Sequence, residues 1–210
     1  MWCYEQGEWL SRRGEVVLCL DEKPNIQALS RTAPKQLMGP GWIERRKFEY
    51  ERRGASTFLV ALHVLNGTMR GCGLERNDHK HFLCGMRQVV HRYRTAKRIH
   101  LIMDNGASHI DRHTQAYFTA HPRLRVVLTP AYASWLNQAE LLLRAFSDQY
   151  LKRFDCRSQQ ELIAQLNASW PEYNRYFAHR FSWSWTRRHM YHWAESKGAL
   201  ISSKTYATVR

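Results

Sequence analysis

Runs of apolar residues that end abruptly in polar or turn-forming residues divide this chain. The clearest runs are EVVLCLDEKP (15–24), KRIHLIMDNGASH (97–109) and LRVVLTP (124–130). Short apolar, β-branched runs bounded by charge, glycine or proline are typical of buried strands. The stretch 56–75 holds an Asn66-Gly67 pair between two further apolar segments, which predicts a β-hairpin.

The segments between and after these strands have the apolar spacing of helices. Residues 77–95 carry an amphipathic pattern with Asn77 or Asp78 available as a cap, and three further helices are predicted over 110–120, 134–154 and 158–176. Antiparallel strands come first and alternating strand–helix units follow, so the fold class is α/β with a mixed sheet flanked by helices. Ligand sites on such sheets lie at the carboxyl ends of strands.

The length of 210 residues suits one domain with small appendages. We expect an N-terminal remnant over 1–14, one main domain over 15–180, and an aromatic and basic C-terminal tail over 181–210. Within the domain, 31–56 reads as a basic loop insertion because it combines Pro and Gly with many Arg and Lys residues.

The charge balance indicates a polyanionic partner. Lys and Arg number 32 against 18 Asp and Glu, which gives a net charge of +14. Nucleic acid is the usual partner of such a domain, and an acidic membrane surface is the weaker alternative because no basic amphipathic helix stands out. No signal peptide and no apolar run of bilayer length is visible, so we expect a cytoplasmic protein and no membrane partner.

The five cysteines favour reduced thiols rather than disulfides, since their number is odd and no CxxC pair occurs. The stretch 72–84 contains Cys72, His79, His81 and Cys84. Their spacing fits no standard zinc module, so we interpret them as two packed thiols and two surface histidines.

Three carboxylates occupy positions that suit metal chemistry. Asp21 and Asp104 end apolar strands, and Glu140 projects from a mostly apolar helix. Brought together, these acids would repel one another unless divalent cations such as Mg²⁺ or Mn²⁺ neutralised them. Turn-forming and helix-capping roles are the alternative for each aspartate, and Glu22 competes with Asp21 for the first position.

The stretches CLDEKPNIQAL, IMDNGASH and TPAYASWLNQAE occur in this order, and 35 residues separate Asp104 from Glu140. Together they resemble the three motifs of the DDE transposases of bacterial insertion sequences, in the mariner superfamily. The resemblance covers about residues 15 to 190 and includes ERRKFEYERRG and HRFSWSW.

The resemblance implies a ribonuclease-H-like fold in which Asp21, Asp104 and Glu140 bind two Mg²⁺ ions, with Mn²⁺ as a substitute. It implies DNA cleavage and strand transfer on double-stranded DNA, at element ends and target, by a homodimer. Full-length relatives carry helix-turn-helix domains before the first aspartate, whereas 20 residues precede Asp21 here. Recognition of the element ends is therefore expected to be missing or to come from a separate helix-turn-helix chain.

Further residues are candidates for DNA contact: Lys23, Arg45, Arg46, Asn105, His109, Trp135 and Asn137. Each has an ordinary alternative. Lys23, Arg45 and Arg46 could be solvated, Asn105 a turn residue, His109 a helix-start histidine, Trp135 a core residue and Asn137 a first-turn asparagine. Two other functions stay open: an inactive DNA-binding transposase remnant, and a structure-specific nuclease of the same fold.

Overall fold

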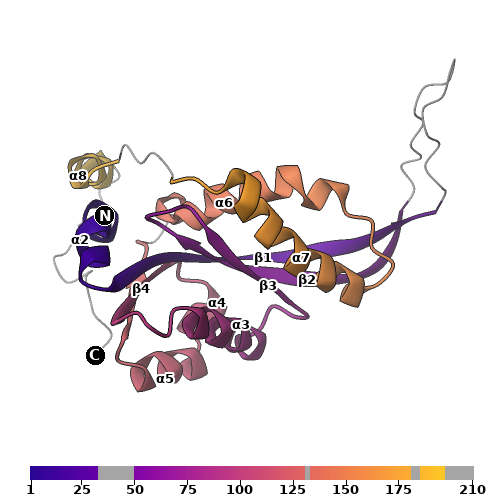
Figure 1. The fold of residues 1–210 in the computed structure, drawn as a ribbon, viewed down its shortest axis with the longest axis horizontal. Helices are drawn as coiled ribbons and strands as arrows, with labels where there is room; N and C mark the ends of the chain where they lie inside the picture. The colour runs from indigo at the N-terminus through magenta and orange to yellow at the C-terminus, as the bar shows by residue number, and fades with distance from the viewer. Residues whose placement is uncertain (33–49, 131–132, 181–184, 197–210) are drawn as a thin grey trace, which may run out of the picture.

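A five-stranded mixed sheet forms the centre of the computed structural model, which describes residues 1–32, 50–130, 133–180 and 185–196 (Figure 1). The strand order is β3-β2-β1-β4-β5. β1 pairs antiparallel with β2, as β2 does with β3, while β1, β4 and β5 run parallel. The strands are β1 (Glu15–Arg31), β2 (Tyr50–His63), β3 (Met69–Leu74), β4 (Arg98–Met103) and β5 (Leu124–Leu128).

Helices cover both faces of this sheet. In Figure 1, α6 and α7 lie on one side and α3, α4 and α5 on the other. The helices are α1 (Trp2–Glu5), α2 (Gly7–Arg12), α3 (His79–Arg92), α4 (Ala107–Ile110), α5 (Arg112–Ala120), α6 (Gln138–Gln149), α7 (Gln159–Phe177) and α8 (Arg187–Ser196), with 3-10 turns η1 (Ser134–Leu136) and η2 (Leu151–Arg153). The mixed α/β fold with helices on both faces confirms the predicted fold class. No helix in the described ranges is both long and apolar enough to cross a lipid bilayer.

Side chains of β1 alternate between two apolar cores. Val17 and Cys19 belong to the core under α6 and α7, whereas Leu18 and Leu20 belong to the core under α3 and α5. Successive strand residues point to opposite faces of a sheet, so a run buried on both faces is apolar throughout. This alternation decides on which face the polar residues that follow Leu20 emerge.

The predicted hairpin is confirmed. Gly67 has a φ of 72°, and its N–H donates to the carbonyl of His63 at 2.8 Å. The side chain of Asn66 accepts from the N–H of Thr68 at 3.0 Å. Gly67 supplies the left-handed backbone, and Asn66 the local hydrogen bond, that this tight turn needs.

β1 and β2 form an antiparallel hairpin that extends into the stretch interpreted as a basic loop insertion or hairpin excursion. Arg31 pairs with Tyr50 at its far end, so residues 50–56, expected within a loop, are strand. Residues 50–54 are exposed. Backbone pairing rather than burial holds this part of the ladder, and the apolar pattern used for prediction carries no signal of it.

Residues 1–14, expected to be a remnant apart from the domain, contribute to its core. They form α1 and α2, and Cys3, Tyr4 and Leu10 are buried in the cluster that contains Val17. The two helices are very short, and a pattern of one or two turns is too brief to be recognised as amphipathic.

The single helix predicted over 134–154 is wrong in detail, because the structure divides it into η1, α6 and η2. Asn137 separates the first two with an extended backbone, φ −83° and ψ 104°, and caps α6. Asparagine favours the cap over the helix interior because its side chain bonds to nearby backbone N–H groups.

Candidate active site

The register of two parallel strands brings Asp21 and Asp104 together. Cys19 of β1 lies opposite Ile102 of β4 at the end of the paired region. The two aspartates each follow two residues later, so they share the sheet face of Cys19 and Ile102, which is the face under α6. Two acids far apart in sequence are therefore neighbours at the carboxyl edge of the sheet.

Glu140 reaches the same edge because α6 is attached to β1. The Asn137 side chain accepts from the N–H of Ala139 at 3.2 Å and donates through Nδ2 to the carbonyl of Leu20 at 2.7 Å. Leu20 directly precedes Asp21. Glu140 lies in the first turn of α6 and is exposed, so it is not the buried carboxylate that its apolar neighbours suggested.

Tyr4 supports this attachment from the N-terminal helix. Its hydroxyl donates to the carbonyl of Leu136 at 2.6 Å and lies 3.0 Å from the Cys19 sulfur. Burial raises the pKa of Tyr4 well above its usual value, so the hydroxyl keeps its proton. Sequence reasoning missed this residue, since a lone tyrosine in a short helix carries no signal of a partner 132 residues away.

The electrostatics of Asp21 show that the three acids converge. Burial first, and then the charges of Asp104 and Glu140, raise the pKa of Asp21 to about 6, against the lowering effects of the Glu22 N–H and of His109. Like charges that interact in this way favour the protonated acid. Oxygen donors of this kind suit a hard divalent cation, which would relieve the repulsion. The donor set thus fits Mg²⁺ or Mn²⁺.

His109 holds Asp104 from the other side. Its Nδ1 lies 2.8 Å from Oδ1 of Asp104, and its Nε2 lies 3.3 Å from Oε2 of Glu22. Although burial lowers the pKa of His109, hydrogen bonds to Asp104 and Glu22 raise it to about 10. The hydrogen bond from His109 also lowers the pKa of Asp104. A buried imidazolium therefore keeps Asp104 ionised and oriented.

Glu22 lies on the opposite face of β1 from Asp21. Its carboxylate accepts from Ser108 Oγ at 2.7 Å and faces His109. Through these contacts Glu22 holds α4 against β1. This supports Asp21 rather than Glu22 as the acid that β1 contributes to the site. The contact between Glu22 and Ser108 was not predicted. For Glu22, the sequence showed only that it stands next to Asp21 and competes with it for the same role.

A pocket of about 360 Å³ opens beside these acids. Its wall includes Asp21, Asp104, Glu22 and His109, together with residues from the starts of α3 and α5. Glu140 is not part of this wall and approaches Asp21 from α6. The acids are thus open on the side where a substrate could approach.

The remaining candidates for DNA contact separate into distinct environments. Lys23 is half-buried on β1, and Asn105 is exposed, with its amide donating to the carbonyl of Thr129 at 2.9 Å. His109 and Asn137 are each 2% exposed, and their side chains bond within the protein. Burial and these internal bonds favour a structural role for His109 and Asn137 over direct contact with DNA.

Trp135 joins an aromatic cluster, with its ring centroid 4.5 Å from that of Trp185 and 5.6 Å from that of Trp193. It is half-buried there, between η1 and the C-terminal helix α8. Arg45 and Arg46 lie outside the described residues.

Replacing Asn137 by alanine is expected to lower the free energy of unfolding by about 2 kcal/mol, from the lost helix cap and the lost bond to Leu20. Asn137→Asp keeps the capping oxygen but loses the donor to Leu20, so it separates the two contributions. Urea unfolding measures both variants against Gln149→Ala, an exposed position on the same helix. Equal stability of Asn137→Ala and Gln149→Ala would contradict the attachment.

The chain is similar in sequence to known proteins. A sequence model described as DDE superfamily endonuclease matches residues 16–163. A Shigella sonnei protein, described as the uncharacterized 39 kDa protein of insertion element IS630, is 29% identical over 152 residues. The match covers 72% of this chain and 41% of that protein, so this chain spans well under half of its relative's length.

The fold is shared with a solved catalytic domain. The catalytic domain of Mos1 mariner transposase matches with a TM-score of 0.50 at 14% identity, over 80% of this chain and 77% of that one. The catalytic core domain of HTLV-2 integrase in complex with magnesium matches with a TM-score of 0.47 at 11% identity, over 77% and 87%.

Proposed function

The chain belongs to the DDE superfamily of endonucleases, and on that premise we propose that it cleaves and joins DNA through Asp21, Asp104 and Glu140. It is a catalytic domain of the transposase type, homologous to an insertion-element protein. The observation that supports the proposal is geometric: the register of Cys19 with Ile102 and the bond from Asn137 to Leu20 direct the three acids to one edge of the sheet. The pKa of Asp21, raised by burial and then by the charges of Asp104 and Glu140, agrees with this.

Enzymes of this family use divalent metal ions. We infer that the three carboxylates hold two Mg²⁺ ions, with Mn²⁺ able to replace them. When bound, such ions activate an attacking oxygen and stabilise the leaving oxygen in a displacement at phosphorus. The number of ions and the preference for Mg²⁺ are part of the proposal.

Four features of the chain support this function. His109 keeps Asp104 anionic, and Asn137 attaches the start of α6 beside Asp21. The pocket leaves the acids open to a phosphate group, and the net charge of +14 favours the backbone of double-stranded DNA. Lys23 and Asn105, near the acids, are the described candidates for contact with that backbone.

We extend the proposal to the partners. The chain would act on element ends and target DNA as a homodimer in the bacterial nucleoid. Recognition of the ends would come from helix-turn-helix segments, on a separate chain or outside these residues. Arg45, Arg46 and Trp135 are further candidates for DNA contact in this proposal.

A plasmid-nicking assay tests the function. We expect purified protein to nick supercoiled DNA in Mg²⁺ and to stop when EDTA removes the ion. An inactive DNA-binding remnant would instead show salt-sensitive binding that neither Mg²⁺ nor Asp104→Asn changes. Binding without nicking, in Mg²⁺ and in Mn²⁺, would reject the catalytic proposal.

A strand-transfer assay separates transposase from nuclease. A DNA end already cut to expose its 3′-hydroxyl is offered together with an intact target plasmid. The transposase proposal predicts joined products, whereas a structure-specific nuclease predicts hydrolysis alone. Joining that disappears in Asp104→Asn would assign the reaction to the site described above.

A further inference from the structure

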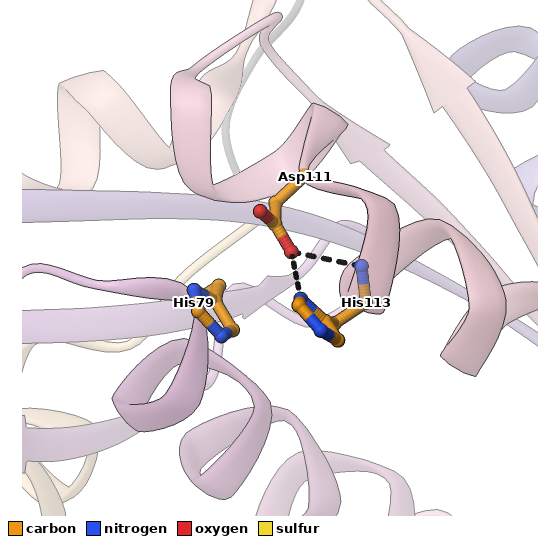
Figure 2. A group of neighbouring side chains, drawn as sticks. All are labelled: His79, Asp111 and His113. Carbon is orange, nitrogen blue, oxygen red and sulfur yellow. Dashed lines mark hydrogen bonds and ion pairs between the residues drawn. The ribbon is translucent and has the colours of Figure 1, made fainter.

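Two histidines and an aspartate meet between the starts of α3 and α5. His79 is the first residue of α3, Asp111 caps α5, and His113 lies in the first turn of α5. Figure 2 shows the two imidazole rings facing each other beside the Asp111 carboxylate. One ligand atom from each residue lies within 4.8 Å of the others. We propose that these three side chains form a Zn²⁺ site separate from the three-acid site.

The donor set selects a different class of metal from that of the acids. Imidazole nitrogens suit Zn²⁺, Ni²⁺ and Co²⁺, whereas carboxylate-only sites suit Mg²⁺ and Mn²⁺. Two histidines and one carboxylate are a known protein ligand set for Zn²⁺, with a fourth position left open to another ligand. His113 is 51% exposed, so that position would face solvent.

Asp111 is already prepared as an anionic ligand. Its Oδ1 accepts from the backbone N–H of His113 at 2.8 Å and lies 3.0 Å from the ring Nδ1 of the same residue. The capping bond from the His113 N–H is the main cause of a lowered pKa for Asp111, and the neighbouring charge of His79 lowers it further. The cap thus fixes the carboxylate beside both rings.

The histidine rings need one adjustment to share an ion. They are stacked with centroids 4.7 Å apart and 12° between their planes. Ring nitrogens coordinate in the plane of the ring, so parallel rings do not aim at one point. Rotation of the exposed His113 ring about its side-chain bonds would converge the nitrogens without moving the backbone.

The location gives the ion a consequence for the neighbouring pocket. His79 and Asp111 line the same pocket as Asp21 and Asp104. A bound dication would add positive charge to the wall of this pocket and join the starts of two helices. The binding itself does not depend on the proposed DNA chemistry, so failure of either proposal leaves the other intact.

The proposed zinc ligands are not the set of Cys and His residues that lie close together in the stretch 72–84. Of the residues in 72–84, His81 bonds to Asp78 at 2.8 Å, Cys72 is buried, and Cys84 is exposed rather than packed. Among the described residues, His79 instead meets Asp111 and His113, from the next helix along the chain. A zinc reading based on spacing within one stretch could not find partners more than 30 residues away.

Calorimetric titration with Zn²⁺ tests the proposal in the Asp21→Asn protein with excess Mg²⁺, which suppresses binding at the acids. We expect one Zn²⁺ per chain. Loss of even an outer-shell partner of a metal lowers affinity about 10- to 100-fold, so His113→Ala and Asp111→Asn should lose at least about tenfold. Asn is a good helix cap, which keeps α5 intact in the second variant. Titration with Co²⁺ adds a visible absorption spectrum as an independent readout.

Two matched controls complete the design. His91→Ala removes an exposed histidine near the other end of α3, and Cys84→Ser removes the exposed thiol. Both should bind Zn²⁺ as the parent does, and circular dichroism checks that each variant folds. Unchanged affinity in His113→Ala and Asp111→Asn would overturn the proposal. So would loss of binding in Cys84→Ser, or the absence of any Zn²⁺ binding by the parent.

Discussion

Replacing Glu140 by glutamine is expected to slow metal-dependent DNA cleavage roughly 100- to 1,000-fold, because bound metal contributes several kcal/mol to such reactions and each 1.36 kcal/mol is tenfold in rate. Glutamine keeps the length and shape of the side chain but not its charge. Glu140 is exposed in the first turn of α6, so the fold should tolerate the change. The expected loss is therefore one of activity rather than of folding.

Rates of plasmid nicking at saturating Mg²⁺ measure this effect. Glu172→Gln is the matched control, because Glu172 is also an exposed helical glutamate but lies on α7. Circular dichroism and thermal unfolding verify that both variants are folded. Equal nicking by Glu140→Gln and Glu172→Gln would show that Glu140 does not take part in cleavage with Asp21 and Asp104.

Replacing Asp21 by asparagine is expected to abolish cleavage and, in metal-free buffer at pH 7, to stabilise the fold. A pKa raised from 3.8 to about 6 corresponds to roughly 3 kcal/mol of unfavourable charge burial, which solvent screening reduces to about 1–2 kcal/mol. Asparagine removes the charge yet can still accept the hydrogen bond from the Glu22 N–H. Function and stability should therefore change in opposite directions.

The effect of Asp21→Asn on the free energy of unfolding should depend on pH. The pKa of Asp21 is higher in the folded protein than in the unfolded chain, so the folded state binds the proton more tightly. The contribution of Asp21 to stability is full below the unfolded value of 3.8 and is lost as pH rises through about 6. The gain from Asp21→Asn should thus be largest near pH 7 and small near pH 4.

Urea unfolding in EDTA at both pH values measures the difference. Asp148→Asn is the control, since Asp148 is an exposed aspartate on α6 whose pKa is lowered by Lys152 rather than raised. Saturating Mg²⁺ should stabilise the parent protein more than Asp21→Asn. An Asp21→Asn protein that is less stable than the parent in EDTA at pH 7 would contradict the raised pKa of Asp21 and the unfavourable burial of its charge.

Local patterns in the sequence carried much of the architecture. Apolar runs ended by Asp21 and Asp104 marked two strands, and the Asn66-Gly67 pair marked the hairpin turn. These signals work because backbone geometry repeats every two or 3.6 residues and turn conformations favour particular residues. The same patterns misjudged α1, α2 and the outer part of β2, where the helices are short or the strand is exposed.

The sequence by itself determined which acids follow the apolar runs and which family motif they form, whereas in the structure β1 continues past Asp21 to Arg31. Only the tertiary structure decided the face on which each side chain emerges and the partner that it meets. The register of Cys19 with Ile102 placed Asp21 beside Asp104. Glu22, on the opposite face of β1, contacts His109 instead. Strand order, register and helix docking are set by packing across the whole core, and no local stretch of sequence encodes the distance between two residues that lie far apart along the chain.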